Sequence, residues 1–167
     1  MGLDSYFYIK RRQSEEEKER MVNQLPEELR SRISDKKSWI SESSTYTEAL
    51  VGYFRKFNAM HGFIVDKYSR DGEDNCQPIY LYQDELEEIK DTVDDVLGHE
   101  GEDDFVEYAK EHFPCRQGFF FGANGDDGDY GEWYVRDCHE LSELMSTLIK
   151  SMQEDDSIVS VIYSASW

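Results

Sequence analysis

Residues 3–12 read LDSYFYIKRR, and residues 137–152 read DCHELSELMSTLIKSM. In the first stretch β-forming side chains alternate between two faces, which predicts a strand with one face toward a core. In the second stretch leucines and methionines recur at spacings of three and four, which predicts an amphipathic helix. A last strand is expected after this helix, over residues 158–163.

The sequence between these stretches shows both helical and strand patterns. A helix is predicted over residues 14–33, because Ser14 followed by Glu17 forms a capping box. The clearest helix is predicted over residues 47–68, where apolar side chains recur at spacings of three and four. The other expected elements are a strand at 79–82, a helix at 84–97, a short helix at 103–113, a strand at 117–122 and a strand over Trp133–Val135.

The order of these elements indicates an α+β fold. The strands are separated by helices of varied length, and no strand is followed by the glycine-rich phosphate turn of a doubly wound sheet. We expect a single domain over residues 1–167, with a mixed or antiparallel sheet of four to five strands packed with helices.

The chain is strongly acidic, and its charge is unevenly distributed. It has 18 basic and 37 acidic residues, which gives a net charge of −19. Residues 1–70 hold 13 basic and 11 acidic residues, whereas residues 71–167 hold 5 and 26, a net −21. This acidic C-terminal part repels phosphate, so neither direct nucleic-acid binding nor binding to an anionic membrane is expected. It favours a partner with a basic groove, although a solvated acidic face that serves solubility gives the same pattern.

The densest carboxylates are the candidates for such a partner surface. On successive helical turns they recur about every 5–6 Å, which is comparable to the spacing of phosphates along one strand. The Gly- and Asp-rich run at residues 124–132 is expected to be a turn. Calcium binding there is an alternative, but Gly128 takes a ligand position of the EF-hand pattern, and we assign no metal ligand. The partner-binding candidates are Asp91, Asp94, Asp95, Glu102, Asp103, Asp104, Asp126, Asp127, Asp129 and Glu132.

A second candidate site is a pocket around Arg55, Asn58 and His61. Asn58 and His61 are three residues apart in the expected helix, so they are neighbours on its surface, with Arg55 adjacent. Together these side chains suit an anion or a nucleotide. The alternative is that His61 lies at the edge of the core, hydrogen-bonded to a strand or loop. Asp66 lies on a different side of the helix, so no carboxylate of this helix orients His61 as a general base.

The sequence favours a binding protein over an enzyme. The motifs of serine hydrolases, P-loop NTPases, zinc proteases and dinucleotide-binding proteins do not occur, and we assign no catalytic residue and no cofactor. The three cysteines form no C-x-x-C pair, which fits buried thiols in a reducing cytoplasm. A zinc site of Cys115, Cys138 and His139 is the alternative. The sequence has no apolar run of about 18 residues and no signal peptide, so a cytoplasmic location is expected.

Several motifs resemble those of a family of small phage and prophage proteins. They are the opening MGLD, YFRKFNAMH at 53–61, QGFFFG at 117–122, WYVRD at 133–137, and the final Ser166 and Trp167. The resemblance spans most of the chain with long gaps, and the chain departs from the family in acidic insertions around 99–107 and 124–131. It implies a phage protein that acts in the cytoplasm of the host cell, and it supplies no catalytic residue.

The acidic balance and the resemblance together favour a non-enzymatic inhibitor. Its expected target is a host nucleic-acid-handling defence complex of the CRISPR or restriction type. The acidic surface would fill a basic groove of this protein or nucleoprotein complex as a DNA mimic. One alternative is a small-molecule or nucleotide-binding protein, or an enzyme, with its pocket at Arg55, Asn58 and His61. Another is an accessory protein that self-associates through exposed aromatic side chains, and the oligomeric state is left open.

Overall fold

One antiparallel sheet forms the centre of the chain. The structure is a computed structural model and describes residues 2–23, 46–118 and 123–167. Its strands β1 (Asp4–Arg12), β2 (Tyr46–Arg55), β3 (Ile79–Leu81) and β4 (Ile158–Ser166) lie in the order β2-β1-β4-β3. Every neighbouring pair is antiparallel, and Asp4 of β1 lies opposite Ser166 of β4. The expected α+β fold is therefore confirmed.

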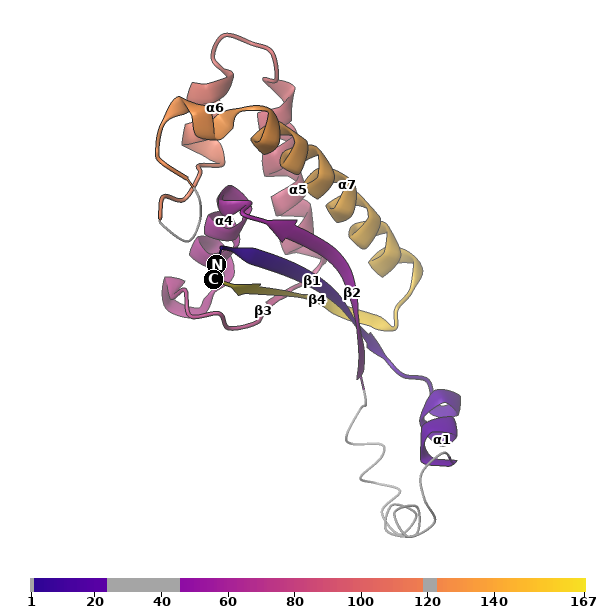
Figure 1. Ribbon diagram of the computed structural model, residues 1–167. Coiled ribbons are helices and arrows are strands. Elements are labelled where there is room, and N and C mark those ends of the chain that lie inside the picture. The colour runs from indigo at the N-terminus through magenta and orange to yellow at the C-terminus, as the bar shows by residue number, and fades with distance from the viewer. Residues whose placement is uncertain (1, 24–45, 119–122) are drawn as a thin grey trace.

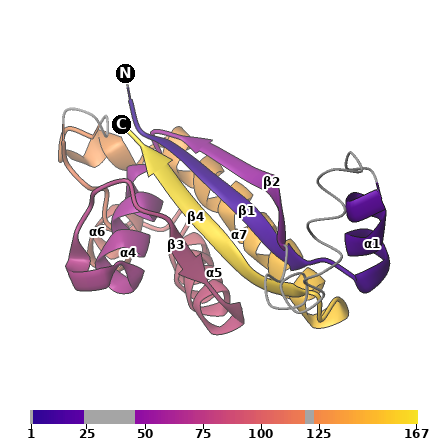
Figure 2. The ribbon, with the colours of Figure 1, turned by 90° about the horizontal axis from the view of Figure 1, so that it is seen from below.

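Helices cover one face of this sheet. The described helices are α1 (Glu15–Asn23), α4 (Asn58–Tyr68), α5 (Gln83–Gly98), α6 (Phe105–His112) and α7 (Glu132–Glu154), with short 3-10 turns η1 (Arg70–Gly72) and η2 (Asp127–Tyr130). In Figure 2, α5 and α7 lie behind the sheet and α4 lies beside them. Helix α1 stands apart, beyond the end of the ribbon that β1 and β2 form (Figure 1). The opposite face of the sheet has no described helix on it.

The core lies between the sheet and the helices. Alternation along β1 sends Ser5 and Phe7 inward, and both are fully buried. Val93 of α5 and Leu141 and Met145 of α7 are fully buried as well. Burial of a large apolar side chain contributes about 1.5–3 kcal/mol. The stacking of α5 and α7 on the sheet is therefore a main source of stability.

The helix predicted over residues 47–68 is wrong in its first half. Tyr46–Arg55 form β2, and the helix begins only at Asn58. Valine, tyrosine and phenylalanine fit a pleated sheet, and pairing with β1 outweighs the helical spacing of the apolar side chains. The strand predicted over Trp133–Val135 is also wrong, because these residues form the first turn of α7.

Other predictions agree with the structure as far as it describes the chain. The predicted helix over residues 14–33 appears as α1, which ends at Asn23, and residues 24–33 lie outside the described residues. Its capping box is confirmed, because the Glu17 N–H donates to Ser14 Oγ at 3.2 Å and the Ser14 N–H to Glu17 Oε2 at 2.8 Å. The strand predicted at 117–122 falls mostly outside the described residues.

Candidate functional site

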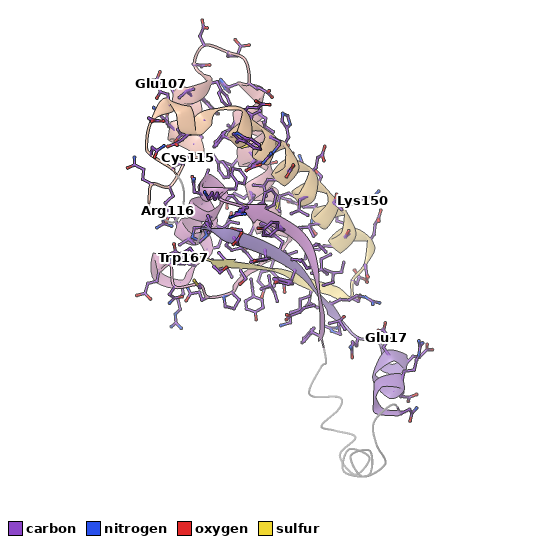
Figure 3. All side chains as sticks on the ribbon, viewed as in Figure 1. Glu17, Glu107, Cys115, Arg116, Lys150 and Trp167 are labelled. Carbon is purple, nitrogen blue, oxygen red and sulfur yellow. The ribbon has the colours of Figure 1, made fainter. Side chains whose placement is uncertain are left out.

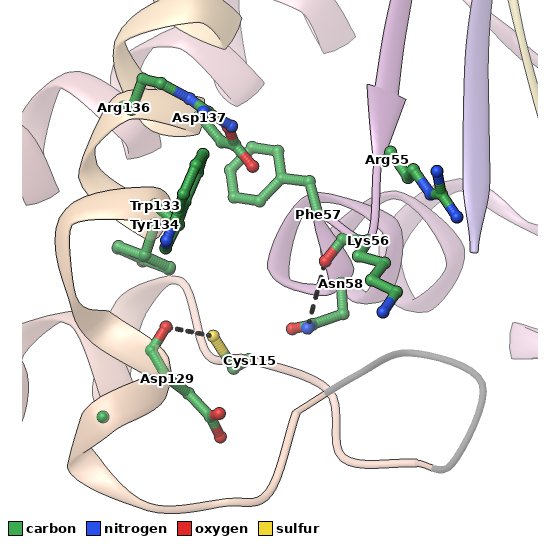
Figure 4. A pocket seen from close by; sticks show the side chains of 11 residues that line it. Arg55, Lys56, Phe57, Asn58, Cys115, Asp129, Trp133, Tyr134, Arg136 and Asp137 are labelled. Carbon is green, nitrogen blue, oxygen red and sulfur yellow. Dashed lines mark hydrogen bonds and ion pairs between the residues drawn. The ribbon is translucent and has the colours of Figure 1, made fainter. Parts of the chain in front are cut away.

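A pocket of about 510 Å³ opens where β2 turns into α4 and faces the first turn of α7. Figure 4 shows the side chains that line it. Lys56 and Asn58 lie on one wall, Trp133 lies on the opposite wall, and Cys115 lies between them at the base. Arg55 and Arg136 belong to the lining as well. The pocket thus joins three parts of the chain that are distant in sequence.

The wall on the β2 side depends on an unusual backbone conformation. Lys56 has a φ of 61°, in the left-handed region, which costs a residue other than glycine about 1 kcal/mol or more. The surrounding chain holds this conformation. The Lys56 N–H donates to the carbonyl of Leu3 at 2.7 Å, and the Asn58 N–H donates to the carbonyl of Lys56 at 2.9 Å. The turn directs Phe57 into the core and starts α4 at the pocket.

The wall on the α7 side carries an exposed tryptophan. The Trp133 side chain is 72% exposed, which is high for the largest aromatic residue. The Arg136 guanidinium lies 4.3 Å from the centre of its ring. Arg136 Nε also donates to Asp137 Oδ1 at 3.0 Å, and Asp137 is nearly buried. This chain of contacts fixes the ring on the first turns of α7.

The base of the pocket contains an unreactive thiol. The Cys115 N–H donates to the Tyr130 hydroxyl at 3.0 Å, and Cys115 Sγ donates to the Asp129 carbonyl at 3.7 Å. Burial raises the pKa of Cys115 to about 12, so the thiol is protonated at neutral pH. Cys138 is buried in the core, where burial raises its pKa too, and His139 is hydrogen-bonded to Glu100 at 2.9 Å. The three candidate zinc ligands thus have separate surroundings.

The lining of this pocket carries a small positive net charge, although the chain as a whole is acidic. The lining holds three cationic residues, Arg55, Lys56 and Arg136, against the two carboxylates of Asp129 and Asp137, which leaves a net charge of +1. The Asp137 carboxylate is paired with Arg136, and the Asp129 carboxylate accepts the N–H groups of two loop residues at 2.6–3.2 Å. The N-termini of α4 and α7 both border the pocket, and their dipoles add positive potential. The arrangement suits an anion.

His61 does not belong to this pocket. It is 1% exposed and lies between β4 and the loop before β3, as Nδ1 is 2.7 Å from the Tyr163 hydroxyl and Nε2 is 2.9 Å from Asp74 Oδ2. The Tyr163 hydroxyl is 3.0 Å from Ser5 Oγ. Burial lowers the pKa of His61, against the opposing effect of Asp74. The structure therefore brings Arg55 and Asn58 together at the pocket, and places His61 in a buried hydrogen-bond network.

Figure 3 shows the end of the molecule that contains the pocket and the surroundings of His61. Cys115, Arg116 and Trp167 gather there, and Glu17 of α1 marks the opposite end. Arg116 Nη1 is 3.9 Å from Asp74 Oδ2. The Asp74 carboxylate therefore contacts both the Arg116 guanidinium and the His61 ring. The ring of Trp167 is centred 5.3 Å from that of His61.

The acidic candidates are spread over the helical side of the molecule. Asp91 and Asp95 are exposed on α5, Glu102 and Asp103 are exposed in the turn after it, and Glu132 is exposed at the start of α7. Five others have local partners: Asp94 contacts Lys90 and Ser142, Asp104 contacts His99, Asp126 accepts from the Gly128 N–H, Asp127 contacts Lys110, and Asp129 accepts from the Asn124 and Gly125 N–H groups.

The partners of these carboxylates bear on their charge and on metal binding. Burial alone would raise the pKa of Asp94, but the hydrogen bonds from Lys90 and Ser142 outweigh burial and the pKa is lowered. In the segment before α7, Asp126, Asp127 and Asp129 accept hydrogen bonds from three different groups, which are the Gly128 N–H, the Lys110 ammonium and the Gly125 N–H. Within the described residues no group of three His, Cys, Asp or Glu side chains is placed to hold a metal ion.

Sequence reasoning missed most of the lining, including Lys56, Trp133 and Arg136. Lys56 gave no signal, because its position depends on a left-handed turn that the predicted helix does not contain. Trp133 and Arg136 have the spacing of three that places side chains on one face of a helix. The prediction of a strand over Trp133–Val135 hides this signal, because side chains three residues apart in an extended chain point to opposite faces.

Comparison of the chain with protein-family models, with curated proteins and with solved structures finds no match. In the described part of the chain, no helix is both long enough and apolar enough to cross a membrane. The function is therefore inferred from the geometry of the pocket and from the distribution of charge.

Proposed function

We propose that the chain is a binding protein for a small anionic ligand with a flat ring, of which a nucleotide is the nearest chemical class. One observation carries the proposal. A chain with a net charge of −19 lines one pocket of about 510 Å³ with Lys56 and Arg136, and Arg55 lies at its edge with the guanidinium directed away from it. The general field repels anions, so this local concentration of cations needs a reason, and an anionic ligand supplies one.

Trp133 supports the ring in this proposal. Aromatic side chains stack on the bases of nucleotides, and such stacking contributes about 1–3 kcal/mol per base. Arg136 covers the indole ring from one side, and the ring stands on the pocket wall opposite Asn58. A base stacked on Trp133 would place its phosphate toward Lys56 and the N-terminus of α4.

The lining residues favour binding over turnover. A nucleophile or general base has to be deprotonated and placed within hydrogen-bond reach of the substrate. Cys115 is protonated at neutral pH, and the Asp129 and Asp137 carboxylates are held by loop N–H groups and by Arg136. The described lining therefore holds a ligand better than it activates one.

Isothermal titration calorimetry tests the proposal. Adenosine, AMP, ADP and ribose 5-phosphate are titrated into the protein, and AMP and ADP are expected to bind more tightly than the two fragments. Lys56→Gln removes one charge-assisted hydrogen bond, which is worth about 1.5–3 kcal/mol, so affinity is expected to fall roughly 10- to 100-fold. Trp133→Ala is expected to weaken AMP binding and to leave ribose 5-phosphate unchanged.

The matched control is Lys67→Gln. Lys67 is a half-exposed lysine on α4 that pairs with Glu88 outside the pocket, and its loss is expected to leave affinity unchanged. The proposal is abandoned if no nucleotide binds at millimolar concentration, or if Lys56→Gln and Lys67→Gln have equal effects.

A second candidate function rests on the acidic surface. We propose as this second function that the chain is a phage-encoded inhibitor, which acts in the host cytoplasm on a host nucleic-acid-handling defence complex. Asp91, Asp95, Glu102 and Asp103 are exposed on α5 and the turn after it, and this supports contact with a Lys- and Arg-lined groove. Such a contact would form quickly and weaken steeply with salt.

Charge reversal distinguishes this second candidate. DNA cleavage by restriction and CRISPR effector complexes is measured with the wild type, with Asp91→Lys/Asp95→Lys, and with Glu16→Lys/Glu19→Lys. The last pair makes the same change of charge on α1, at the far end of the molecule. Inhibition is expected to be lost only with the α5 pair. Equal inhibition by both variants would remove the α5 surface from consideration.

A further inference from the structure

Strand β2 forms one edge of the sheet, and this edge exposes apolar side chains. Among the described strands only β1 pairs with it. Residues 46–51 are exposed, although they are part of a ten-residue strand. Leu50 is 55% and Tyr53 50% exposed. An edge strand of this length with apolar side chains is a template for pairing with another strand.

We propose that two copies of this chain pair through β2 in antiparallel orientation, with Glu48 of each copy opposite Arg55 of the other. These two residues are the only charged residues of β2, and they have opposite signs. An antiparallel pair of identical strands is related by a two-fold axis, so each contact occurs twice. The axis would pass between residues 51 and 52, and Leu50 of each copy would then lie opposite Tyr53 of the other.

The bulge in β2 makes this register consistent with the two faces of the sheet. Gly52 lies opposite Phe7 and Leu50 lies opposite Tyr8, so Val51 is the extra residue. The bulge brings residues 48 and 50 to the same face as residues 53 and 55. Without it, a strand that alternates strictly would place Glu48 and Arg55 on opposite faces. The same register thus pairs opposite charges, pairs Leu50 with Tyr53, and keeps all four side chains on one face.

The charge of the molecule also favours a second copy at this edge. Two chains of net charge −19 repel each other over most of their surfaces. The two charges of β2 cancel, so the strand adds no net charge to this edge. A second copy also supplies the complementary charge at the right distance along the strand, because the complement of Glu48 is Arg55 of the same sequence.

Sedimentation velocity and light scattering test the proposal on the full chain without ligand, so the result does not depend on the proposed pocket. The wild type is expected to form a dimer at micromolar concentration. Glu48→Arg and Arg55→Glu each replace two attractive contacts by two repulsive ones. Each variant is expected to raise the dimer dissociation constant at least roughly tenfold. Tyr80→Ser, at the other edge of the sheet, is the control and is expected to remain dimeric.

Mixing the two charge variants tests the register itself. A Glu48→Arg chain and an Arg55→Glu chain are complementary to each other in the proposed register, so an equimolar mixture is expected to form a heterodimer. The double variant Glu48→Arg/Arg55→Glu is expected to dimerise like the wild type. Circular dichroism confirms that each variant is folded. The proposal is overturned by a wild type that stays monomeric at 100 µM, or by charge variants that dimerise like the wild type.

Discussion

The hydrogen-bond network of Tyr163 gives the most quantitative prediction. Its hydroxyl contacts Ser5 Oγ at 3.0 Å and His61 Nδ1 at 2.7 Å, and all three side chains are almost fully buried. In the tautomer in which His61 donates through Nε2 to Asp74 Oδ2, Nδ1 accepts from the Tyr163 hydroxyl. Tyr163→Phe therefore removes one hydrogen-bond partner from each of two buried groups, Ser5 Oγ and His61 Nδ1. Each costs about 1–3 kcal/mol, so the free energy of unfolding is expected to fall by roughly 2–6 kcal/mol.

Urea denaturation measures this loss, and two further variants test its cause. Tyr68→Phe removes a hydroxyl that bonds to Glu88 near the surface, and it is expected to cost less than about 1 kcal/mol. Adding Ser5→Ala to Tyr163→Phe removes one of the two stranded groups, so the double variant is expected to be no less stable than Tyr163→Phe alone. A loss below about 0.5 kcal/mol for Tyr163→Phe would refute the reasoning about this network.

Three other predictions concern protonation, thiol reactivity and packing. Because burial lowers the pKa of His61, the unfolded chain takes up a proton first as pH falls below about 6.5. The wild type should then lose more stability between pH 7.5 and 5.5 than His61→Asn, and equal losses in urea denaturation would contradict this. With iodoacetamide at pH 8, mass spectrometry is expected to find exposed Cys76 alkylated at least about tenfold faster than Cys115, whose pKa burial raises to about 12; similar rates would count against the buried thiol. Leu141→Ala should lower the free energy of unfolding by about 2–5 kcal/mol, and a loss below about 1 kcal/mol in urea would mean that α7 packs loosely.

The elements that sequence reasoning predicted well are those with a clear local pattern. Strand β1 alternates in its own sequence, and α5 and α7 have apolar stripes that need no knowledge of the rest of the chain. Strand β2 is different. Its apolar residues fit a helical spacing equally well, and only the pairing with β1 decides between the two. A window of ten residues holds no information about pairing with a strand that is distant in the sequence, so this pairing could not be predicted from the local pattern.

The candidate site was predicted only in part for the same reason. Arg55 and Asn58 are close in sequence, so their proximity could be inferred. Trp133 and Arg136 reach the pocket from α7, and nothing in the sequence relates that helix to the β2–α4 turn. The carboxylate that orients His61 is Asp74, which returns from the loop after α4 rather than from the helix itself. Its loop conformation depends on tertiary contacts.

The neighbouring positions of β1 and β4 have a mechanical consequence. The chain enters the sheet at Asp4 and leaves it at Ser166, and these two residues lie opposite each other. A force applied through both ends of the chain would pull perpendicular to the strands, and would load the hydrogen bonds between β1 and β4 one pair at a time. The two strands would therefore separate pair by pair at low force, and the first buried side chains exposed would be Ser5 and Ala165.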